Sequence, residues 1–190
     1  MTTESREHMD DDELVARFRL DPEEFTAVYD RYFREVYLYV AGRLDVQAGE
    51  DIAAETFCLA FRDRERFDPT RGGVRPWLFG IATNLMARHR RKEARHYRAL
   101  ARTSADPPAD SHEGRVVDTV TAQRMGPRLA RALATLNRGE RDVLTLSYLA
   151  ELTHQEVADA LGISYGTVGS RLNRARKKIH QSMAKEDNRG

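Results

Sequence analysis

Apolar residues recur every three or four positions through most of the chain, with polar residues between them. This is the spacing at which one face of an α-helix meets a core. Runs that alternate apolar and polar side chains, as half-buried strands do, are absent. We therefore predict an all-α fold, and we interpret its longest stripe as core rather than as an aromatic ligand site. That stripe consists of Phe25, Val28, Tyr29, Tyr32, Phe33, Val36, Tyr37 and Val40.

The pattern breaks at residues 99–115, which lack apolar periodicity and contain Pro107 and Pro108 among Ser, Asp and Gly. This composition favours a flexible linker. We expect two small helical domains, one on either side of it. The predicted boundaries are 1–11 for an acidic flexible N-terminus, 12–98 for the first domain, 99–115 for the linker, 116–184 for the second domain and 185–190 for a tail.

Residues 153–180 carry the signals of two short helices joined by a tight turn. Thr153 and Glu156 have the spacing of a capping box, in which each side chain satisfies a free backbone group at a helix start. Gly162 permits the left-handed turn that ends this helix, and Ser164 suits the N-cap of the next one. Two helices in this layout are typical of a DNA-binding helix-turn-helix.

The second of these helices divides into a buried stripe and a basic outward stripe. The outward stripe can lie along a major groove, with short polar groups near base edges and cations on phosphates. A helical hairpin with a solvated basic face is the alternative. Gly166 and Gly169 each cost about 1 kcal/mol in a helix interior, and close approach of the backbone to DNA would explain them. The buried stripe is Val168, Leu172, Ala175 and Ile179, and the outward stripe is Thr167, Arg171, Arg174 and Lys178, flanked by Ser170, Asn173 and Lys177.

A helix predicted over residues 49–66 has a charged face opposite its apolar one, and Asp51 and Glu55 stand there four residues apart. Paired carboxylates can serve a metal or an acid and base pair, but no further ligand is placed locally to complete such a site. A solvated face and a docking surface for a basic partner helix are the other interpretations. Cys58 falls beside these acids. We interpret it either as ordinary helix surface or as a redox residue. The apolar side is Ile52, Ala53, Phe57, Ala60 and Phe61, and Arg62 joins the acids.

A loop at residues 67–76 leads into a second basic helix. Arginines at steps of four and three along it can follow a phosphate backbone, and Asn84 at their head can hydrogen-bond a base. A solvated polar face is the alternative. The core side of this helix is Trp77, Leu78, Ile81, Ala82 and Leu85, and the polar stripe is Asn84, Arg88, Arg91, Arg95 and Arg98.

Composition narrows the class of protein. The formal net charge of +1 conceals an acidic N-terminus and two basic stretches, at 88–98 and 171–178, which suggest two contacts with a polyanion. Cys58 is the only cysteine, which excludes an intrachain disulfide and a cysteine-based zinc site. No apolar run approaches membrane-spanning length. We expect a cytoplasmic protein with no cofactor, no metal and no membrane contact of its own.

Four blocks of the chain, taken in order, resemble the bacterial extracytoplasmic-function sigma factors. The blocks are FTAVYDRYFREVYLYV, EDIAAETFCLAFRDRERFDP, RPWLFGIATNLMARHRRKEAR and, after the linker, LNRGERDVLTLSYLAELTHQEVADALGISYGTVGSRLNRARKKI. The resemblance covers nearly all of residues 20–183. It implies sigma region 2 in the first domain and sigma region 4 in the second, and it implies three partners: core RNA polymerase, promoter DNA and an anti-sigma factor.

The resemblance also implies roles for particular residues. The acidic helix would contact core polymerase, and the WLFGIATN run with the 67–76 loop would open and read the −10 region around an extruded base. The GTVGSRLNRAR run would read the −35 element, where Gly169 replaces a common lysine or arginine. The implied sets are Asp51, Glu55 and Cys58 for polymerase, with Ala54 in place of a frequent glutamine; Trp77, Asn84, Arg88 and Arg91 for the −10 element; and Thr167, Ser170, Arg171 and Arg174 for the −35 element. To these DNA-binding sets we add Arg95 and Lys178, which continue the two basic stripes.

Two other classes of protein compete with this interpretation. The C-terminal helix-turn-helix also resembles that of response-regulator and quorum-sensing transcription regulators, whose N-terminal half would be an α/β receiver or sensor domain. A nucleic-acid enzyme would rest on Asp51, Glu55 and His89 alone. We expect no enzymatic activity.

Overall fold

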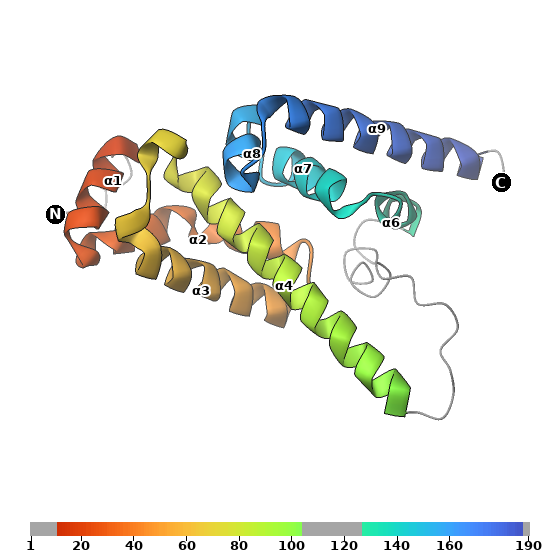
Figure 1. Ribbon diagram of the computed structural model, residues 1–190, viewed down its shortest axis with the longest axis horizontal. Helices are drawn as coiled ribbons and strands as arrows, with labels where there is room; N and C mark the ends of the chain where they lie inside the picture. The colour runs from red at the N-terminus through yellow and green to blue at the C-terminus, as the bar shows by residue number, and fades with distance from the viewer. Residues whose placement is uncertain (1–10, 104–126, 188–190) are drawn as a thin grey trace.

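The structure is a computed structural model that describes residues 11–103 and 127–187. All its regular elements in those ranges are helices, which confirms the predicted all-α class (Figure 1). The terminal residues 1–10 and 188–190, and most of the predicted linker, lie outside the described residues.

The N-terminal domain places helices α2 and α3 side by side, with the long helix α4 crossing them (Figure 1). Asp45 starts α3 because its carboxylate accepts a hydrogen bond from the backbone N–H of Ala48, at 2.9 Å. The elements are α1 (Asp11–Leu20), η2 (Pro22–Glu24), α2 (Phe25–Ala41), α3 (Val46–Asp63), η3 (Arg64–Arg66), η4 (Pro69–Arg71) and α4 (Val74–Thr103).

The elements differ from the prediction in several places, and α9 (Tyr165–Asp187) runs into the predicted tail at 185–190. Helix α1 was not predicted, although its residues Leu14, Val15 and Phe18 are buried in the core. Helix α3 spans 46–63 rather than 49–66, because Asp45 caps it three residues earlier. Helix α4 continues to Thr103, so the first residues of the predicted linker, 99–103, are helical.

The aromatic stripe of α2 is core over only part of its width. Phe25, Val28, Tyr32, Val36 and Val40 are buried as predicted. Tyr29 is 41% exposed, and Phe33 and Tyr37 are half-buried at the edge of the domain. Phe33 stacks on both, with ring centroids 4.6 Å from Tyr29 and 6.2 Å from Tyr37.

In the described part of the C-terminal domain, capping side chains fix the starts of α7 and α8. Asn137 and Glu140 form a capping box on α7, and Thr153 and Glu156 form the predicted one on α8. Gly162 ends α8 at φ 60, in the left-handed region predicted for it. The helices are α6 (Pro127–Ala134), α7 (Arg138–Tyr148), α8 (His154–Leu161) and α9 (Tyr165–Asp187).

The two domains pack against each other, with α8 on one side of α4 (Figure 1). One continuous apolar cluster includes Val28 and Leu78 of the first domain and Val157 and Leu172 of the second. Helix α4 therefore has a second buried face, made of Phe79, Gly80, Thr83 and Met86. This interdomain contact was not predicted from the sequence.

Candidate polymerase and promoter interfaces

Helix α3 presents the predicted acidic face to solvent. Asp51, Glu55 and Cys58 are all exposed, and Cys58 is a free thiol. Gln47 supports this face, since its amide donates to Asp51 Oδ1 at 3.4 Å. The opposite side is buried as predicted at Ile52, Ala53, Phe57 and Ala60, whereas Phe61 is 41% exposed.

Among the described residues, no group of three His, Cys, Asp or Glu side chains is close enough together to hold an ion. The exposed carboxylates of Asp51 and Glu55 can face a protein partner. Their charge favours a basic one.

The carboxylate of Asp68 caps the short helix η4 in the 67–76 loop. Asp68 Oδ1 accepts hydrogen bonds from the Thr70 hydroxyl at 2.7 Å and from the Thr70 backbone N–H at 3.0 Å. These two bonds, the hydroxyl first, lower the pKa of Asp68 and keep it ionised. Gly72 follows at φ 129, a conformation that favours glycine.

Trp77 lies where the loop meets α4, and it is half-buried rather than core as its stripe predicted. Its ring packs on Phe67, with centroids 4.8 Å apart. Both rings line a cavity of about 500 Å³ beside the loop. This volume lies within the range of small-molecule and cofactor pockets, roughly 300–1,000 Å³.

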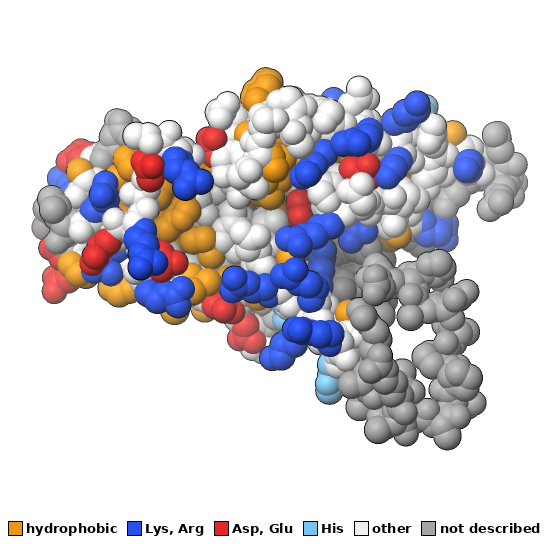
Figure 2. Space-filling model, in the orientation of Figure 1, with side chains coloured by type: hydrophobic (Ala, Val, Ile, Leu, Met, Phe, Trp, Pro, Cys, Tyr) orange, Lys and Arg blue, Asp and Glu red, His pale blue; other side chains and the backbone are white. Residues whose placement is uncertain are grey.

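The polar stripe on α4 is exposed over its described length, at Asn84, Arg88, Arg91 and Arg95. None of these arginines forms an ion pair with another described residue. Lys and Arg side chains form a band over this part of the molecule and a second one along α9 (Figure 2). The stripe can therefore meet a polyanion without breaking a described ion pair. The side chain of Arg98 lies outside the described residues.

On α9 the predicted buried stripe holds at Val168, Leu172 and Ala175, while Ile179 is half-buried. The hydroxyl of Ser164 caps the helix as predicted, accepting from the Thr167 N–H at 3.2 Å. These contacts fix which side of α9 faces away from its domain.

The predicted outward stripe of α9 is only partly outward. Arg174 and Ser170 are exposed, but Thr167, Arg171 and Lys178 are half-buried. Arg171 and Lys178 contact α7. Lys178 Nζ donates to Glu140 Oε2 at 2.7 Å. The guanidinium of Arg171 lies over Gly139, whose position would bring an added Cβ to 3.0 Å from Arg171 Nη1.

Exposed residues of α9 at steps of four, three and four are Gly166, Ser170, Asn173 and Lys177. The sequence pattern made Asn173 and Lys177 only flanking positions. Steps of four and three fit both the predicted outward stripe and this exposed line, so spacing alone does not choose between them. Which set faced out was decided by the packing of α7. A Cβ added at Gly166 or Gly169 would meet nothing within 4 Å, so neither glycine is required by packing within the chain.

Glu140 is the most deeply buried carboxylate among the described residues of this domain, with 2% of its surface exposed. Burial alone would raise its pKa, but the hydrogen bonds from Lys178 and from the Asn137 backbone N–H lower it. The charged carboxylate joins the start of α7 to the middle of α9. Glu140 thereby sets the orientation of the candidate DNA-reading helix.

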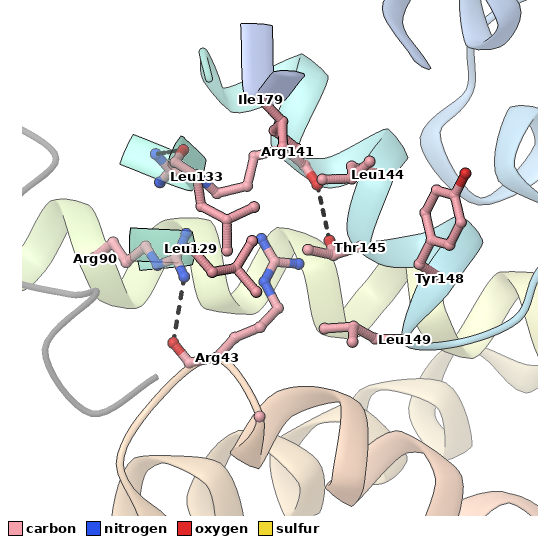
Figure 3. Close-up of a pocket in the computed structure, with 11 residues that line it drawn as sticks. Arg43, Arg90, Leu129, Leu133, Arg141, Leu144, Thr145, Tyr148, Leu149 and Ile179 are labelled. Carbon is pink, nitrogen blue, oxygen red and sulfur yellow. Dashed lines mark hydrogen bonds between the residues drawn. The ribbon is translucent and has the colours of Figure 1, made fainter. Parts of the chain in front are cut away.

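A pocket of about 180 Å³ lies at the junction of the two domains (Figure 3). Its walls are mostly apolar and come from α6, α7 and α9, with Leu129, Leu133 and Ile179 among them. Arg43 enters it from the N-terminal domain and points toward Thr145 (Figure 3). Arg43 is therefore a residue of one domain seated in the other.

Family comparisons match both domains. The Sigma-70 region 2 model matches residues 28–96, and the model for Sigma-70, region 4 matches residues 127–179. The ECF RNA polymerase sigma factor SigL of Mycobacterium tuberculosis is 31% identical over 159 residues, which cover 83% of this chain and 87% of SigL. The ECF sigma factor RpoE of Cereibacter sphaeroides is 27% identical over 166 residues, which cover 86% of this chain and 88% of RpoE.

Solved structures share the arrangement of helices. CnrH, in complex with the cytosolic domain of CnrY, matches with a TM-score of 0.62 and 25% identity over 90% of this chain and 95% of that one. The sigma factor RpoE of Bartonella quintana, solved with the anti-sigma factor NepR, matches in fold with a TM-score of 0.61 and 18% identity. The match covers 85% of this chain and 98% of that one.

The helical N-terminal domain rules out the α/β receiver that a response regulator would need. No helix within the described ranges is long and apolar enough to cross a membrane. Two sigma regions match family models, and relatives such as SigL align over most of their length. Both findings identify the same family. The chain belongs to the ECF RNA polymerase sigma factors, with sigma region 2 in its N-terminal domain and sigma region 4 in its C-terminal domain.

Proposed function

We propose that this sigma factor docks on core RNA polymerase through α3, reads the −10 element with the 67–76 loop and α4, and reads the −35 element with α9. One observation carries the assignment. An acidic face, a basic stripe led by an amide and a polar helix face are all exposed, and each lies on a different helix. We assign no catalytic role to any residue and expect the protein to act in the cytoplasm.

The polymerase contact is assigned to Asp51, Glu55 and Cys58. The two carboxylates and the thiol lie on one side of a helix whose other side is buried, so the face is held rigidly by the core. A rigid acidic face is suited to a basic partner helix, because its charges need no rearrangement on binding.

The −10 contact is assigned to Trp77, Asn84, Arg88, Arg91 and Arg95. Trp77 and Phe67 offer aromatic surface beside a cavity, where an unstacked base can pack. Asn84 follows two helical turns later, and its amide can both donate to and accept from a base edge. The arginines beyond it suit the phosphates of the same strand.

The −35 contact is assigned to Ser170 and Arg174, together with the flanking positions Asn173 and Lys177 that the structure exposes. Thr167 and Arg171 lie at the edge of this face. Lys178 is assigned a supporting role through Glu140 as well as the phosphate contact predicted for the outward basic stripe. The helix is presented for insertion into a major groove, as in other helix-turn-helix proteins.

We also propose that an anti-sigma factor restrains the protein. CnrH, which shares this fold, was solved with the cytosolic domain of a second protein bound. Copurification of a partner with the tagged chain from its own host would support the proposal. A chain that always purifies without any partner would count against it.

Run-off transcription tests the main assignment. Core RNA polymerase is incubated with a library of promoters, with and without this protein. We expect initiation from a small set of promoters only when the protein is present. Equal initiation with and without it would refute the proposed function.

A charge reversal tests the polymerase surface. Asp51→Lys with Glu55→Lys should abolish binding to core polymerase, since placing like charges across an interface costs several kcal/mol. The change should leave the circular dichroism spectrum and the melting temperature unaltered, because both side chains are exposed. Glu23→Lys, at an exposed acid in η2 of the same domain, is the matched control. Binding that survives the double reversal would place the docking face elsewhere.

A further inference from the structure

A cavity of about 280 Å³ lies beside the first turn of α7, next to the apolar pocket of Figure 3. The two share Arg43, Arg90 and Arg141 as lining residues. Its volume falls just below the roughly 300–1,000 Å³ of small-molecule pockets, so a ligand there must be small. The charged residues among its described lining are Arg43, Arg90, Arg91, Arg138, Arg141 and Asp142.

The charges around this cavity are unequal. Its described lining contains five arginines and one acid, which leaves a formal excess of four positive charges. Both oxygens of Asp142 are engaged, because Oδ1 accepts from Arg43 Nη2 at 2.9 Å and Oδ2 pairs with Arg138 Nε at 3.4 Å. Like charges repel, and more strongly where water is partly excluded. The cavity is therefore complementary to a small anion that carries several charges.

Hydrogen bonds to neutral groups hold several of these arginines in place. Arg43 is 5% exposed, and its Nη1 donates to Tyr39 Oη at 2.6 Å. Arg90 Nη2 donates to the backbone carbonyl of Arg43 at 3.3 Å. Arg141 Nη2 donates to the backbone carbonyl of Leu136, also at 3.3 Å. A ligand that meets charges already fixed in position loses little free energy to rearrangement.

The geometry of the guanidinium group favours phosphoryl ligands. Its planar fork of N–H donors matches the oxygens of a phosphate in pairs. The first turn of α7 forms one wall and adds the partial positive charge of a helix N-terminus. One phosphoryl group carries about −1.5 to −2 charges near neutral pH. Two joined phosphoryl groups therefore match the formal excess of charge more closely than one does.

The depth of the cavity separates this ligand from promoter DNA. Thr83 and Met86 also line the cavity, and they are 2% and 1% exposed. Arg43 is buried at the same junction. The outer surface of a duplex cannot reach side chains at this depth, whereas a small anion that enters between α4 and α7 can.

We propose that this cavity is a binding site for a small diphosphate, held by the arginines of both domains. Arg43, Arg90 and Arg91 belong to the N-terminal domain, and Arg138 and Arg141 belong to α7. Inorganic diphosphate and the diphosphate group of a nucleotide present the same phosphoryl oxygens, so both belong to the proposed class of ligand. Neither the cavity nor its charge depends on the polymerase and promoter contacts assigned above.

Calorimetric titration of the full chain with sodium diphosphate tests the site, at physiological ionic strength and without added divalent cations. We expect saturable binding of a single diphosphate. Arg138→Gln should weaken it about ten- to a hundredfold, because hydrogen bonds between charged groups are lost. The side chain of Arg138 is 57% exposed, and Asp142 keeps its bond to Arg43 in this variant. The melting temperature without ligand should therefore stay close to that of the wild type.

A second variant and two controls locate the binding. Arg90→Gln should weaken diphosphate binding as Arg138→Gln does, so the result does not depend on one substitution. Arg138→Lys should retain part of the affinity, because lysine keeps the charge but not the planar fork. Arg95→Gln is the matched control, since Arg95 is exposed on the same helix as Arg90 and does not line the cavity. It should bind diphosphate as tightly as the wild type.

The outcomes that overturn the proposal are distinct. Absence of binding, or wild-type affinity in both Arg138→Gln and Arg90→Gln, would show that the cavity is not the site. An equal loss in Arg95→Gln would show binding to the general basic surface. Orthophosphate that binds as tightly as diphosphate would overturn the match to two phosphoryl groups.

A parallel titration with ADP distinguishes the two sources of diphosphate. Tighter binding of ADP supports a nucleotide as the ligand, because the nucleoside then adds contacts of its own. Equal or weaker binding of ADP supports the inorganic anion. Failure of run-off transcription would refute the sigma-factor assignments and leave these titrations unaffected.

Discussion

At the scale of single residues, Glu140 connects the fold to the DNA-reading surface. Its carboxylate accepts from the Asn137 backbone N–H at 3.0 Å and from Lys178 at 2.7 Å. The first bond completes the cap of α7 and the second holds α9. Because these bonds outweigh burial, the pKa of Glu140 lies below its usual 4.5. The residue is a charged support beneath a helix rather than a ligand of DNA.

This depressed pKa predicts how stability depends on pH. Glu140 stabilises the fold fully above its unfolded pKa of about 4.5, and the contribution is lost as pH falls through the lower folded-state value. Glu140→Gln should therefore cost about 2 kcal/mol at pH 7, where charge-assisted hydrogen bonds are lost, and progressively less toward pH 3. Urea unfolding of both proteins between pH 3 and pH 7 measures the difference. A cost that is the same at both ends of the range would show that the charge of Glu140 does not matter.

At the scale of elements, α4 carries three faces that serve different purposes. Leu78, Ala82 and Leu85 pack into the N-terminal core, and Phe79 and Met86 pack toward the second domain. Asn84 and the exposed arginines occupy the third face. Trp77 stands between the core and the exposed face, which explains why it is half-buried.

Two substitutions on the third face of α4 should have different signatures. Arg91→Ala should weaken binding to −10 single strands about equally for all sequences, and should reduce the slope of log K against log salt by roughly 0.7. Asn84→Ala should leave that slope unchanged and reduce discrimination at one base by about 1–3 kcal/mol. Fluorescence anisotropy with a set of base-substituted oligonucleotides at several salt concentrations separates the two. Identical effects of both substitutions would contradict the division between base and phosphate contacts.

Elements with local signals were predictable, and those that depend on distant partners were not. The helix-turn-helix was found because Thr153, Glu156 and Gly162 act within a few residues of each other. The second buried face of α4 had a signal, since Phe79 and Met86 are apolar and seven residues apart, outside the predicted stripe. The outward side of α9 had none, because α7 decides it from 38 residues away through Glu140 and Lys178.

At the scale of the whole molecule, the unpredicted feature is the contact between the domains. Arg43 and Asp142 are 99 residues apart, and neither the arginine nor the aspartate carries a local sign that it will be buried. Burial alone would lower the pKa of Arg43, but Tyr39 and Asp142 raise it, so the guanidinium stays charged. A sequence pattern describes the faces of single helices. It does not state which two faces meet.

The shared core predicts that the protein unfolds as one unit. Because one apolar cluster includes residues of both domains, neither domain can melt without exposing surface of the other. Differential scanning calorimetry should show a single transition for the wild type, with equal calorimetric and van't Hoff enthalpies. A Cβ at Gly80 would lie 2.5 Å from the carbonyl oxygen of Ala160 in α8, so Gly80→Ala should separate the domains while favouring the α4 helix. Its trace should then resolve into two transitions, one for each domain. Gly166→Ala should retain the single transition, since its methyl group extends into open space. Two transitions in the wild type would mean that the domains are thermodynamically independent and that the buried Arg43–Asp142 pair does not couple them.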